Sequence, residues 1–482
     1  MPCVTVKWSG QNLDVDADIE EEPLVFKSQL FAMTGVPPDR QKVMFKGKTL
    51  KDDTWDGFPV QEGSTLMMLG SSAMVPELKQ ETPKESTSNS VQYDENGEQM
   101  VKLPSGLQNL GNTCYMNATL QSFLVIPELV QGISNWTSAG STKAQNAVMK
   151  NYTGSIFTLF RDLASKEREC YIPLLQLTLM HKLYPQFATQ GEQGGWQQQD
   201  ANECFSELLR EFADASEIDV KDERNEVKKV PVRRFLEGEF EIQMKNTENP
   251  EEAVQTSKEK FMQLSCFLSQ DTRYLQSGIR SKLSEEIVKH SNTLGKDCTY
   301  LKEAKISRLP AHLTIQMVRF FYKEKDQVNA KILKDVKFPM ILDLCDCCTP
   351  ELQAKLRPYR DAFKEYEDNK IEEQRAAKLK EGKQTVKKEP EEFAPSSFED
   401  DPGSCNSGFY QLNAIITHKG RSSNSGHYVA WIRLQGDKWA MCDDETTIPV
   451  TEEQVLKLSG GGDWHCAYVL IYGPRRLPIS KS

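Results

Sequence analysis

The chain contains 482 residues, carries a formal net charge of −11 and includes 12 cysteines. This length predicts two or three domains, and the acidic balance argues against a nucleic-acid surface, which needs clustered basic residues. No segment approaches the ~18 consecutive apolar residues that a membrane-spanning helix requires. We therefore expect the partner to be another protein or a peptide.

The first residues, MPCVTVKWSG, lack the apolar segment of a signal peptide, and Pro2 occupies the position where N-myristoylation needs a glycine. We therefore expect a cytoplasmic protein, with the nucleus as a second compartment. Cysteines are kept reduced in these compartments, so each thiol is a candidate for packing, metal binding or catalysis.

Residues 1–75 predict a small mixed domain. CVTVKWSGQNLDVDA alternates as two strands around a Ser-Gly turn, EPLVFKSQLFAMTG predicts a helix with Pro23 near its start, and KVMFKGKTL and TLMML predict further strands. This order resembles ubiquitin, a β-grasp fold. LGSSAMV follows the last strand in place of a terminal Arg-Gly-Gly, which predicts a fused ubiquitin-like module and not a precursor.

The resemblance to ubiquitin also implies a contact surface on this module. RQKVMFKGKTLKDD is similar to the segment that carries the main hydrophobic patch of ubiquitin. The patch would centre on Met44, with Val43 and Leu69 as neighbours. The alternative is that Met44 is an ordinary exposed methionine, because single apolar residues are common on protein surfaces.

Residues 76–104 are polar and almost free of aliphatic side chains, which predicts a flexible linker. Residues 105–475 follow as one large domain with helices early and β-rich runs late, such as GFYQLNAIITH, HYVAWIRL and CAYVLIY. Within this domain, residues 361–402 are strongly charged with both signs mixed. We expect a solvated helix followed by a disordered insertion there.

Cys114 stands at a junction between a tight polar turn and a helix pattern. It follows Gly-Asn-Thr and opens YMNATLQSFLVIPELV, whose apolar spacing predicts a buried helix. A thiol at a helix N-terminus faces unpaired N–H groups and the positive end of the helix dipole, which favour the thiolate. The alternative is a packing cysteine, because free cysteines are among the most buried residues.

A nucleophilic thiol needs a base and a group that orients the base. His427 follows the polar loop RSSNSG and begins the strand HYVAWIRL, and Asp443 and Asp444 follow on the next strand. A hairpin folded symmetrically about Gly436-Asp437 places position 446 opposite His427. Strand parity then puts Asp444 on the face of His427, whereas Asp443 would need a bulge to reach it.

Three segments carry a resemblance to the ubiquitin-specific proteases. GLQNLGNTCYMNATLQ is similar to the cysteine box of the family, SGHYVAWIRLQGDKWAMCDDETT to its histidine box, and QQQDANECFSELL to the segment between them. The resemblance implies an α+β, papain-like catalytic domain of thumb, palm and fingers. With the ubiquitin-like module in front, it narrows to the proteasome-associated branch of the family.

The resemblance assigns a role to each matching residue. It makes Cys114 the nucleophile, His427 the general base and Asp443 the orienter of the imidazole, with Asp444 as the reserve choice. Asn109 matches the amide of the oxyanion hole, and the alternative is a loop asparagine that makes a turn. The implied reaction is hydrolysis of the bond after the C-terminal glycine of ubiquitin.

The implied partners are ubiquitin and ubiquitin chains, together with the regulatory particle of the proteasome, which the ubiquitin-like domain would bind. The free chain is expected to be a monomer. The main alternative is a catalytically weak, ubiquitin-binding scaffold that regulates the proteasome. A second alternative is cleavage of another ubiquitin-like modifier.

Two features depart from the family or stay open. Many members bind zinc through two C-x-x-C pairs. In this sequence Ser269 stands at the position where the second thiol of the Cys266 pair would be, and Cys298 also lacks its partner. LCDCCTP has three cysteines but no second ligand pair at zinc spacing. The sequence therefore predicts no metal and no cofactor. The glycine-containing loops 191–196 and 420–426 flank the catalytic boxes and are either gates over the tail channel or ordinary connections.

Overall fold

The structure is a computed structural model. It describes residues 2–8, 11–19, 21–34, 36, 38, 41–51, 54–69, 102–138, 147–191, 194–221, 226–323, 328–379, 392–422, 425–462 and 464–479. The predicted linker lies outside the described residues except for its last three positions. Within the described part of the chain, no helix is both long enough and apolar enough to cross a membrane.

The N-terminal domain is a five-stranded sheet packed against one helix. The strand order is β2-β1-β5-β3-β4, with β1 and β5 parallel at its centre. Helix α1 begins at Pro23, whose fixed φ and missing N–H suit the first helical position. The elements are β1 Cys3–Trp8, β2 Gln11–Asp16, α1 Pro23–Thr34, β3 Lys42–Phe45, β4 Lys48–Thr49 and β5 Thr65–Leu69.

The prediction that Val43 belongs to the contact surface is wrong. Val43 is 0% exposed and belongs to the core between the sheet and α1. Successive side chains of a strand point to opposite faces, so Met44 points away from the core, directly opposite Met67 on β5. Met67 is exposed and Leu69 is 50% exposed. We therefore define the outer sheet surface as Met44, Met67 and Leu69.

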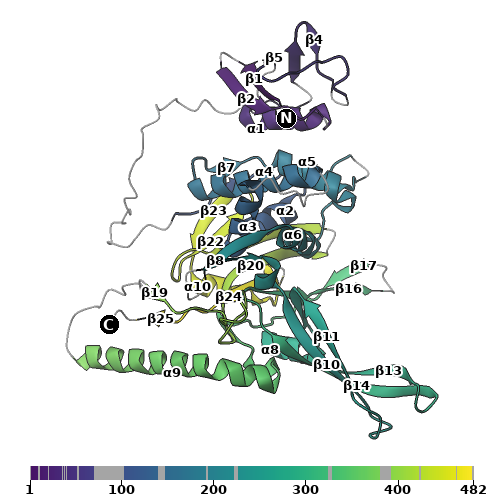
Figure 1. The fold of residues 1–482 in the computed structure, drawn as a ribbon, viewed down its shortest axis with the longest axis vertical. Helices are drawn as coiled ribbons and strands as arrows, with labels where there is room; N and C mark the ends of the chain where they lie inside the picture. Colours follow the sequence, from purple (N-terminus) through teal and green to yellow (C-terminus); the bar gives the residue numbers. More distant parts are fainter. Residues whose placement is uncertain are drawn as a thin grey trace.

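Helices make up the first part of the catalytic domain, the thumb, and they cover one face of the central sheet (Figure 1). Every residue of α2, the helix that begins at Cys114, is buried. The elements of this part are β6 Gly106–Leu107, α2 Cys114–Phe123, α3 Pro127–Ser138, α4 Ala147–Ser165, β7 Cys170–Tyr171, α5 Leu174–Leu183, η2 Pro185–Ala188 and α6 Ala201–Ala215.

A ten-stranded sheet forms the palm, with the main order β12-β15-β24-β20-β21-β22-β23. Its elements are β12 Gln263–Phe267, β15 Leu313–Val318, β16 Phe320–Lys323, β17 Val328–Lys331, β18 Ile341–Asp343, β20 Phe409–Ser422, β21 Ser425–Arg433, β22 Trp439–Asp443, β23 Thr446–Val450 and β24 Cys466–Pro474. Along β21, Tyr428 and Ala430 pack into the thumb core, whereas Val429 and Trp431 pack into the core on the opposite face. The predicted β-rich runs are thus strands buried on both faces.

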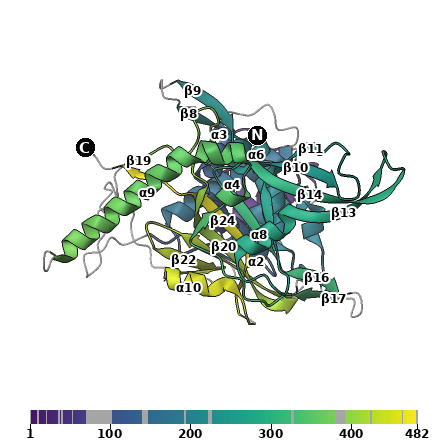
Figure 2. The same ribbon diagram turned by 90° about the horizontal axis from the view of Figure 1, so that it is seen from below.

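The fingers are a separate four-stranded antiparallel sheet, order β11-β10-β14-β13, that projects away from the palm (Figure 1). Its strands are β10 Gly238–Asn246, β11 Gln255–Phe261, β13 Ser284–Ser291 and β14 Lys296–Arg308. The remaining elements are β8 Glu217–Lys221, β9 Val227–Pro231, α7 Arg233–Leu236, α8 Leu275–Leu283, η3 Cys345–Cys347, α9 Pro350–Leu379, β19 Glu392–Phe393, α10 Glu452–Leu456, η4 Lys457–Ser459 and β25 Pro478–Ile479. Helix α9 extends away from the body on the side opposite the fingers (Figure 2).

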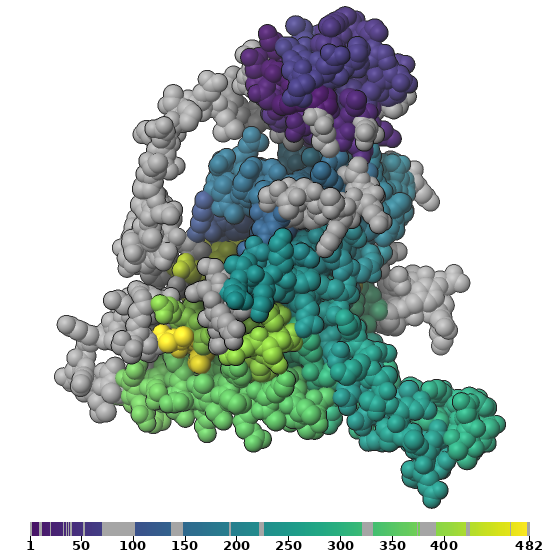
Figure 3. All heavy atoms as spheres, in the orientation of Figure 1, coloured from purple at the N-terminus to yellow at the C-terminus, as the bar shows by residue number. Residues whose placement is uncertain are grey.

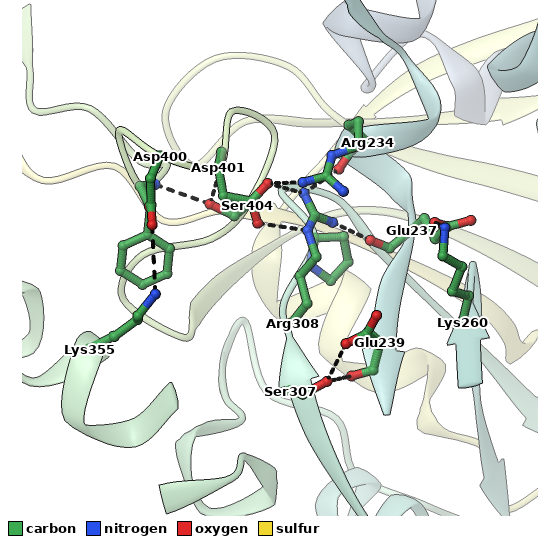
Figure 4. Close-up of polar contacts among 12 residues, drawn as sticks. Arg234, Glu237, Glu239, Lys260, Ser307, Arg308, Lys355, Asp400, Asp401 and Ser404 are labelled. Atoms are coloured by element: carbon green, nitrogen blue, oxygen red, sulfur yellow. Dashed lines mark hydrogen bonds and ion pairs between the residues drawn. The ribbon is translucent and has the colours of Figure 1, made fainter. Parts of the chain in front are cut away.

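The predicted charged insertion is only partly solvated. Residues 380–391 lie outside the described residues, but Asp401 belongs to the folded domain. The Arg308 guanidinium donates to the Asp401 carboxylate from Nε at 2.7 Å and from Nη2 at 2.9 Å, and Arg234 pairs with the same carboxylate (Figure 4). These ion pairs join the segment before β20 to the base of the fingers, so residues 392–402 were wrongly grouped with the insertion.

We predict that Asp401→Asn destabilises the catalytic domain, because the replacement leaves Arg308, whose side chain is 14% exposed, without its anionic partner. The expected loss is about 2 kcal/mol in the free energy of unfolding. Asp400→Asn is the matched control, because Asp400 is 75% exposed and lies 3.7 Å from Lys355. Equal midpoints of denaturant unfolding for the two variants would contradict this role for Asp401.

Candidate active site

Cys114 is the first residue of α2 and is buried. The turn before it places Gly111 and Asn112 in the left-handed region, with φ of 97° and 55°. The Thr113 hydroxyl accepts a hydrogen bond from the Leu110 N–H at 2.8 Å and so fixes this turn. Among the described residues, no group accepts a hydrogen bond from the Cys114 N–H. The first N–H groups of a helix have no partner within the helix. The thiol thus lies at the positive end of the helix dipole.

His427 lies near the start of β21, opposite Lys419 of β20. Gly426, just before it, has a φ of 145°, and a Cβ there would lie 2.3 Å from the Lys419 carbonyl oxygen. Only glycine fits this close approach of two strands. The Tyr428 N–H, on the other side of His427, donates to the Cys114 sulfur at 3.5 Å. The backbone around His427 therefore lies directly against the start of α2.

The His427 imidazole is held between a carboxylate and the thiol. Its Nε2 lies 2.5 Å from the Asp443 Oδ1. Hydrogen bonds with Asp443 and with Cys114 raise the pKa of His427 to about 10. The same bond from His427 lowers the pKa of Asp443 below its usual value. The raised pKa favours the protonated form of the imidazole beside the thiol.

The hairpin that presents these residues is not symmetric. Arg433 pairs with Trp439 and Ala430 with Cys442, so the register places position 445, and not 446, opposite His427. A shift of one residue moves every side chain to the other face. Asp443 thus shares the face of His427 without a bulge, and the parity argument for Asp444 was wrong. The cause is the turn, where the Leu434 N–H donates to the Lys438 carbonyl.

Asp444 has a different environment from its neighbour. Its side chain is 8% exposed, and its nearer oxygen lies 3.9 Å from the His427 Nε2. The two carboxylate oxygens accept hydrogen bonds from the amide nitrogens of Asn109 and Asn117, each at 2.8 Å. Burial raises the pKa of Asp444 above its usual value. Asp444 therefore orients the Asn109 amide and does not contact the imidazole as closely as Asp443 does.

Sequence reasoning missed three residues that shape this site. Asn117 binds Asp444, and the Glu445 carboxylate accepts from the Asn109 N–H at 2.9 Å. Gly106 packs so closely on the turn after β22 that a Cβ there would lie 2.1 Å from the Glu445 carbonyl oxygen. A glycine within a strand pattern is a known signal of close backbone approach. No comparable signal marks Asn117, which sits in the middle of a helix.

The two predicted gate loops are described only in part. In the first, the Gly191 N–H donates to the Gly195 carbonyl at 2.7 Å, and the Trp196 carbonyl accepts from the Asn112 amide at 2.8 Å. In the second, residues 423 and 424 lie outside the described residues. The first loop thus lies beside the turn that precedes Cys114, and the second leads into His427. Gating stays a prediction.

Within the described residues, one group of three potential metal ligands lies close together, namely His427, Asp443 and Asp444. Its members are already satisfied by one another and by amide groups, so they do not fit a metal site. At the fingertip, the Glu252 carboxylate is also occupied by hydrogen bonds, which it accepts from the Asn246 amide at 2.7 Å and from the Tyr300 hydroxyl at 2.7 Å. The absence of zinc stays a prediction.

A thiol at a helix N-terminus, an imidazole fixed by a carboxylate, and an amide beside the thiol form the arrangement for nucleophilic acyl transfer. Fold and site together define a cysteine hydrolase with an α+β catalytic domain. The sequence model described as "Ubiquitin carboxyl-terminal hydrolase" matches residues 105–472, and the model described as "Ubiquitin family" matches residues 4–72. The chain belongs to the ubiquitin carboxyl-terminal hydrolase family, and it is a deubiquitinating enzyme with an N-terminal ubiquitin-like domain.

Relatives match nearly the whole chain. Ubiquitin carboxyl-terminal hydrolase 14 of Caenorhabditis elegans is 40% identical, covering 98% of this chain and 94% of the relative. Ubiquitin carboxyl-terminal hydrolase 6 of Arabidopsis thaliana is 36% identical, covering 98% of this chain and 99% of the relative. Ubiquitin carboxyl-terminal hydrolase 6 of Schizosaccharomyces pombe is 35% identical, covering 97% of this chain and 98% of the relative. A chain of the SAGA Ubp8/Sgf11/Sus1/Sgf73 DUB module bound to ubiquitin aldehyde shares the fold, with a TM-score of 0.52 and 20% identity. The match covers 77% of this chain and 70% of that chain.

We predict that Asp443→Asn moves the alkaline limit of activity to lower pH. Asp443 is the main cause of the raised His427 pKa of about 10, so its loss lets the imidazolium deprotonate nearer its ordinary value of ~6.5. The protonated form, present below the pKa, is then lost earlier as pH rises. We also expect a large drop in kcat/KM, up to the ~10⁴-fold seen when a triad aspartate becomes asparagine.

The measurement is kcat/KM against pH with ubiquitin carrying a fluorogenic C-terminal amide. Asp444→Asn is the control, because Asp444 binds Asn109 and Asn117 instead of the imidazole. Asp444→Asn should reduce the rate and leave the alkaline limit in place. If Asp444→Asn moves the limit and Asp443→Asn does not, the orienter has been assigned to the wrong aspartate.

Proposed function

We propose that Cys114 is the nucleophile of this deubiquitinase and His427 its general base. His427 takes the proton of the Cys114 thiol, the thiolate attacks the carbonyl carbon of the C-terminal glycine of ubiquitin, and the π electron pair of the C=O bond moves to oxygen. Collapse breaks the C–N bond while His427 protonates the departing lysine amine. A water molecule, deprotonated by His427, then attacks the thioester carbonyl carbon. The C–S bond breaks, which releases the ubiquitin carboxylate and returns Cys114 as the thiolate beside protonated His427.

The contact of His427 with both Asp443 and Cys114 carries this proposal. A scaffold that only binds ubiquitin has no use for a thiol, an imidazole and a carboxylate in contact, so the arrangement favours the enzyme over the scaffold. Ubiquitin as the substrate is supported by the family and by the ubiquitin aldehyde on the related DUB module.

The oxyanion would be stabilised by two donors. The Cys114 N–H has no acceptor among the described residues. The Asn109 amide nitrogen donates one proton to the Asp444 Oδ2 at 2.8 Å and keeps a second proton for the substrate oxygen. In well-studied hydrolases one such donor contributes ~10²–10³-fold in rate. Asp444 acts through Asn109 and is therefore a positioning residue.

We expect Cys114→Ala to abolish release of a C-terminal amide from ubiquitin, because no other thiol contacts His427 among the described residues. The measurement is fluorogenic turnover, with binding of intact ubiquitin as the check on folding. Cys345→Ser is the matched control, because Cys345 is a partly exposed free thiol in η3, outside the site. Turnover of Cys114→Ala above about a thousandth of wild type would contradict the assignment.

The ubiquitin-like domain is proposed to dock the enzyme on the regulatory particle of the proteasome through the outer sheet surface. The family resemblance and the exposed side chains of Met67 and Leu69 beside Met44 support this surface. Apolar side chains grouped on a strand face are typical of protein contacts. The free chain is proposed to be a monomer of the cytoplasm and nucleus.

Met44→Asp should weaken binding of the full chain to proteasomes, because it places a charge in an apolar contact. The measurement is co-sedimentation with purified proteasomes. Ile19→Asp is the matched control, since Ile19 is an exposed apolar residue between β2 and α1, outside the sheet. Unchanged binding of Met44→Asp, or equal losses in both variants, would place the docking surface elsewhere.

A further inference from the structure

Helix α1 of the ubiquitin-like domain carries buried apolar side chains on two faces. Phe26 and Leu30 belong to the core of the domain itself. Val25 is 3% exposed, yet it packs into the cluster of buried residues that the thumb helices form. Val25, Gln29 and Met33 are four residues apart and so lie along one face of the helix. We call this stripe the outer face of α1.

The surface opposite the outer face of α1 is formed by α4 and α5 of the thumb, directly below the ubiquitin-like domain in Figure 1 and Figure 3. Between the two surfaces lies a groove of about 1000 Å³, and all three residues of the outer face line it. Leu159 of α4 and Leu179 of α5 line it from the thumb side. The two domains therefore meet without filling the space between them, and relative motion of domains is the default expectation where their interface is not large and hydrophobic.

An ion pair lies at the edge of this interface. The Lys182 Nζ, in the last turn of α5, lies 3.3 Å from the Glu21 carboxylate and 3.7 Å from the Glu22 carboxylate. The Glu21 carbonyl accepts from the Trp55 indole N–H at 2.6 Å, which fixes the backbone that carries this charge. Charges at the rim of an interface fix its orientation more than its strength. The pair therefore selects one orientation of α1 against α5.

We propose that the outer face of α1 is a docking surface through which the ubiquitin-like domain binds reversibly to α4 and α5 of its own catalytic domain. In this docked arrangement Met67 and Leu69 of the outer sheet surface stay exposed. The ubiquitin-like domain can thus contact the thumb and a second protein at the same time. The inference goes beyond the proposed function and does not depend on which protein binds the outer sheet surface.

The docked domain rests on a helix that also reaches the active site. His181, next to Lys182, packs edge-on against Trp196, with ring centroids 4.4 Å apart. The Trp196 carbonyl in turn accepts from the Asn112 amide, two residues before the nucleophile. A partner that moves the ubiquitin-like domain therefore acts first on the helix that supports the loop beside Cys114.

Zero-length cross-linking tests the contact in the full chain without any added partner. A carbodiimide should join Lys182 to Glu21 or Glu22 within one molecule, and peptide mass mapping identifies the product. The Lys258–Glu239 pair of the fingers, 2.8 Å apart, is the internal control. Formation of the control product without a Lys182 product would overturn the proposal. So would a product that joins a labelled to an unlabelled chain in a mixture.

A charge swap tests the docked contact independently. Lys182→Glu places three carboxylates together, so the domains should separate and the radius of gyration in small-angle scattering should rise. The triple variant Lys182→Glu, Glu21→Lys, Glu22→Lys restores opposite charges and should restore the compact value. Lys245→Glu, which breaks a pair with Glu303 in the fingers, is the control. An unchanged radius in Lys182→Glu, with an unchanged unfolding midpoint, would overturn the proposal.

Discussion

The proposed active site depends on one contact, the 2.5 Å approach of the His427 Nε2 to the Asp443 Oδ1. That contact exists because the hairpin between β21 and β22 turns with Arg433 paired to Trp439, which sets Asp443 on the face of the imidazole. A turn longer or shorter by one residue would move the aspartate to the other face of the sheet. The catalytic geometry therefore rests on backbone register, and the register rests on a turn far from the thiol.

The two neighbouring aspartates show how one short turn serves two purposes. The hydrogen bond with His427 lowers the pKa of Asp443, whereas burial raises the pKa of Asp444. In the proposed mechanism Asp443 orients the general base His427, and Asp444 holds the Asn109 amide beside the nucleophile Cys114. Because Asp443 and Asp444 come from the palm and Asn109 from the segment before α2, the site is complete only when thumb and palm are packed together.

Much of this could be predicted from the sequence, and the failures share a cause. The start of α1 at Pro23, the α2 start at Cys114 and the late strands follow from local patterns. The choice between Asp443 and Asp444 depends on the register of the hairpin. The burial of Val43 depends on which face of the sheet meets α1. The place of Asp401 in the folded domain depends on the position of Arg308. Each depends on residues distant in sequence, which periodicity does not report.

The most direct test of the account is a reaction with ubiquitin that carries an electrophile at its C-terminus. Thiol attack then traps the first step as a stable adduct, and peptide mapping shows which of the 12 cysteines carries it. The account predicts one adduct per chain, on Cys114, with the other cysteines unmodified. An adduct on a different cysteine, or none while ubiquitin still binds, would contradict the site derived from the Cys114, His427 and Asp443 contacts.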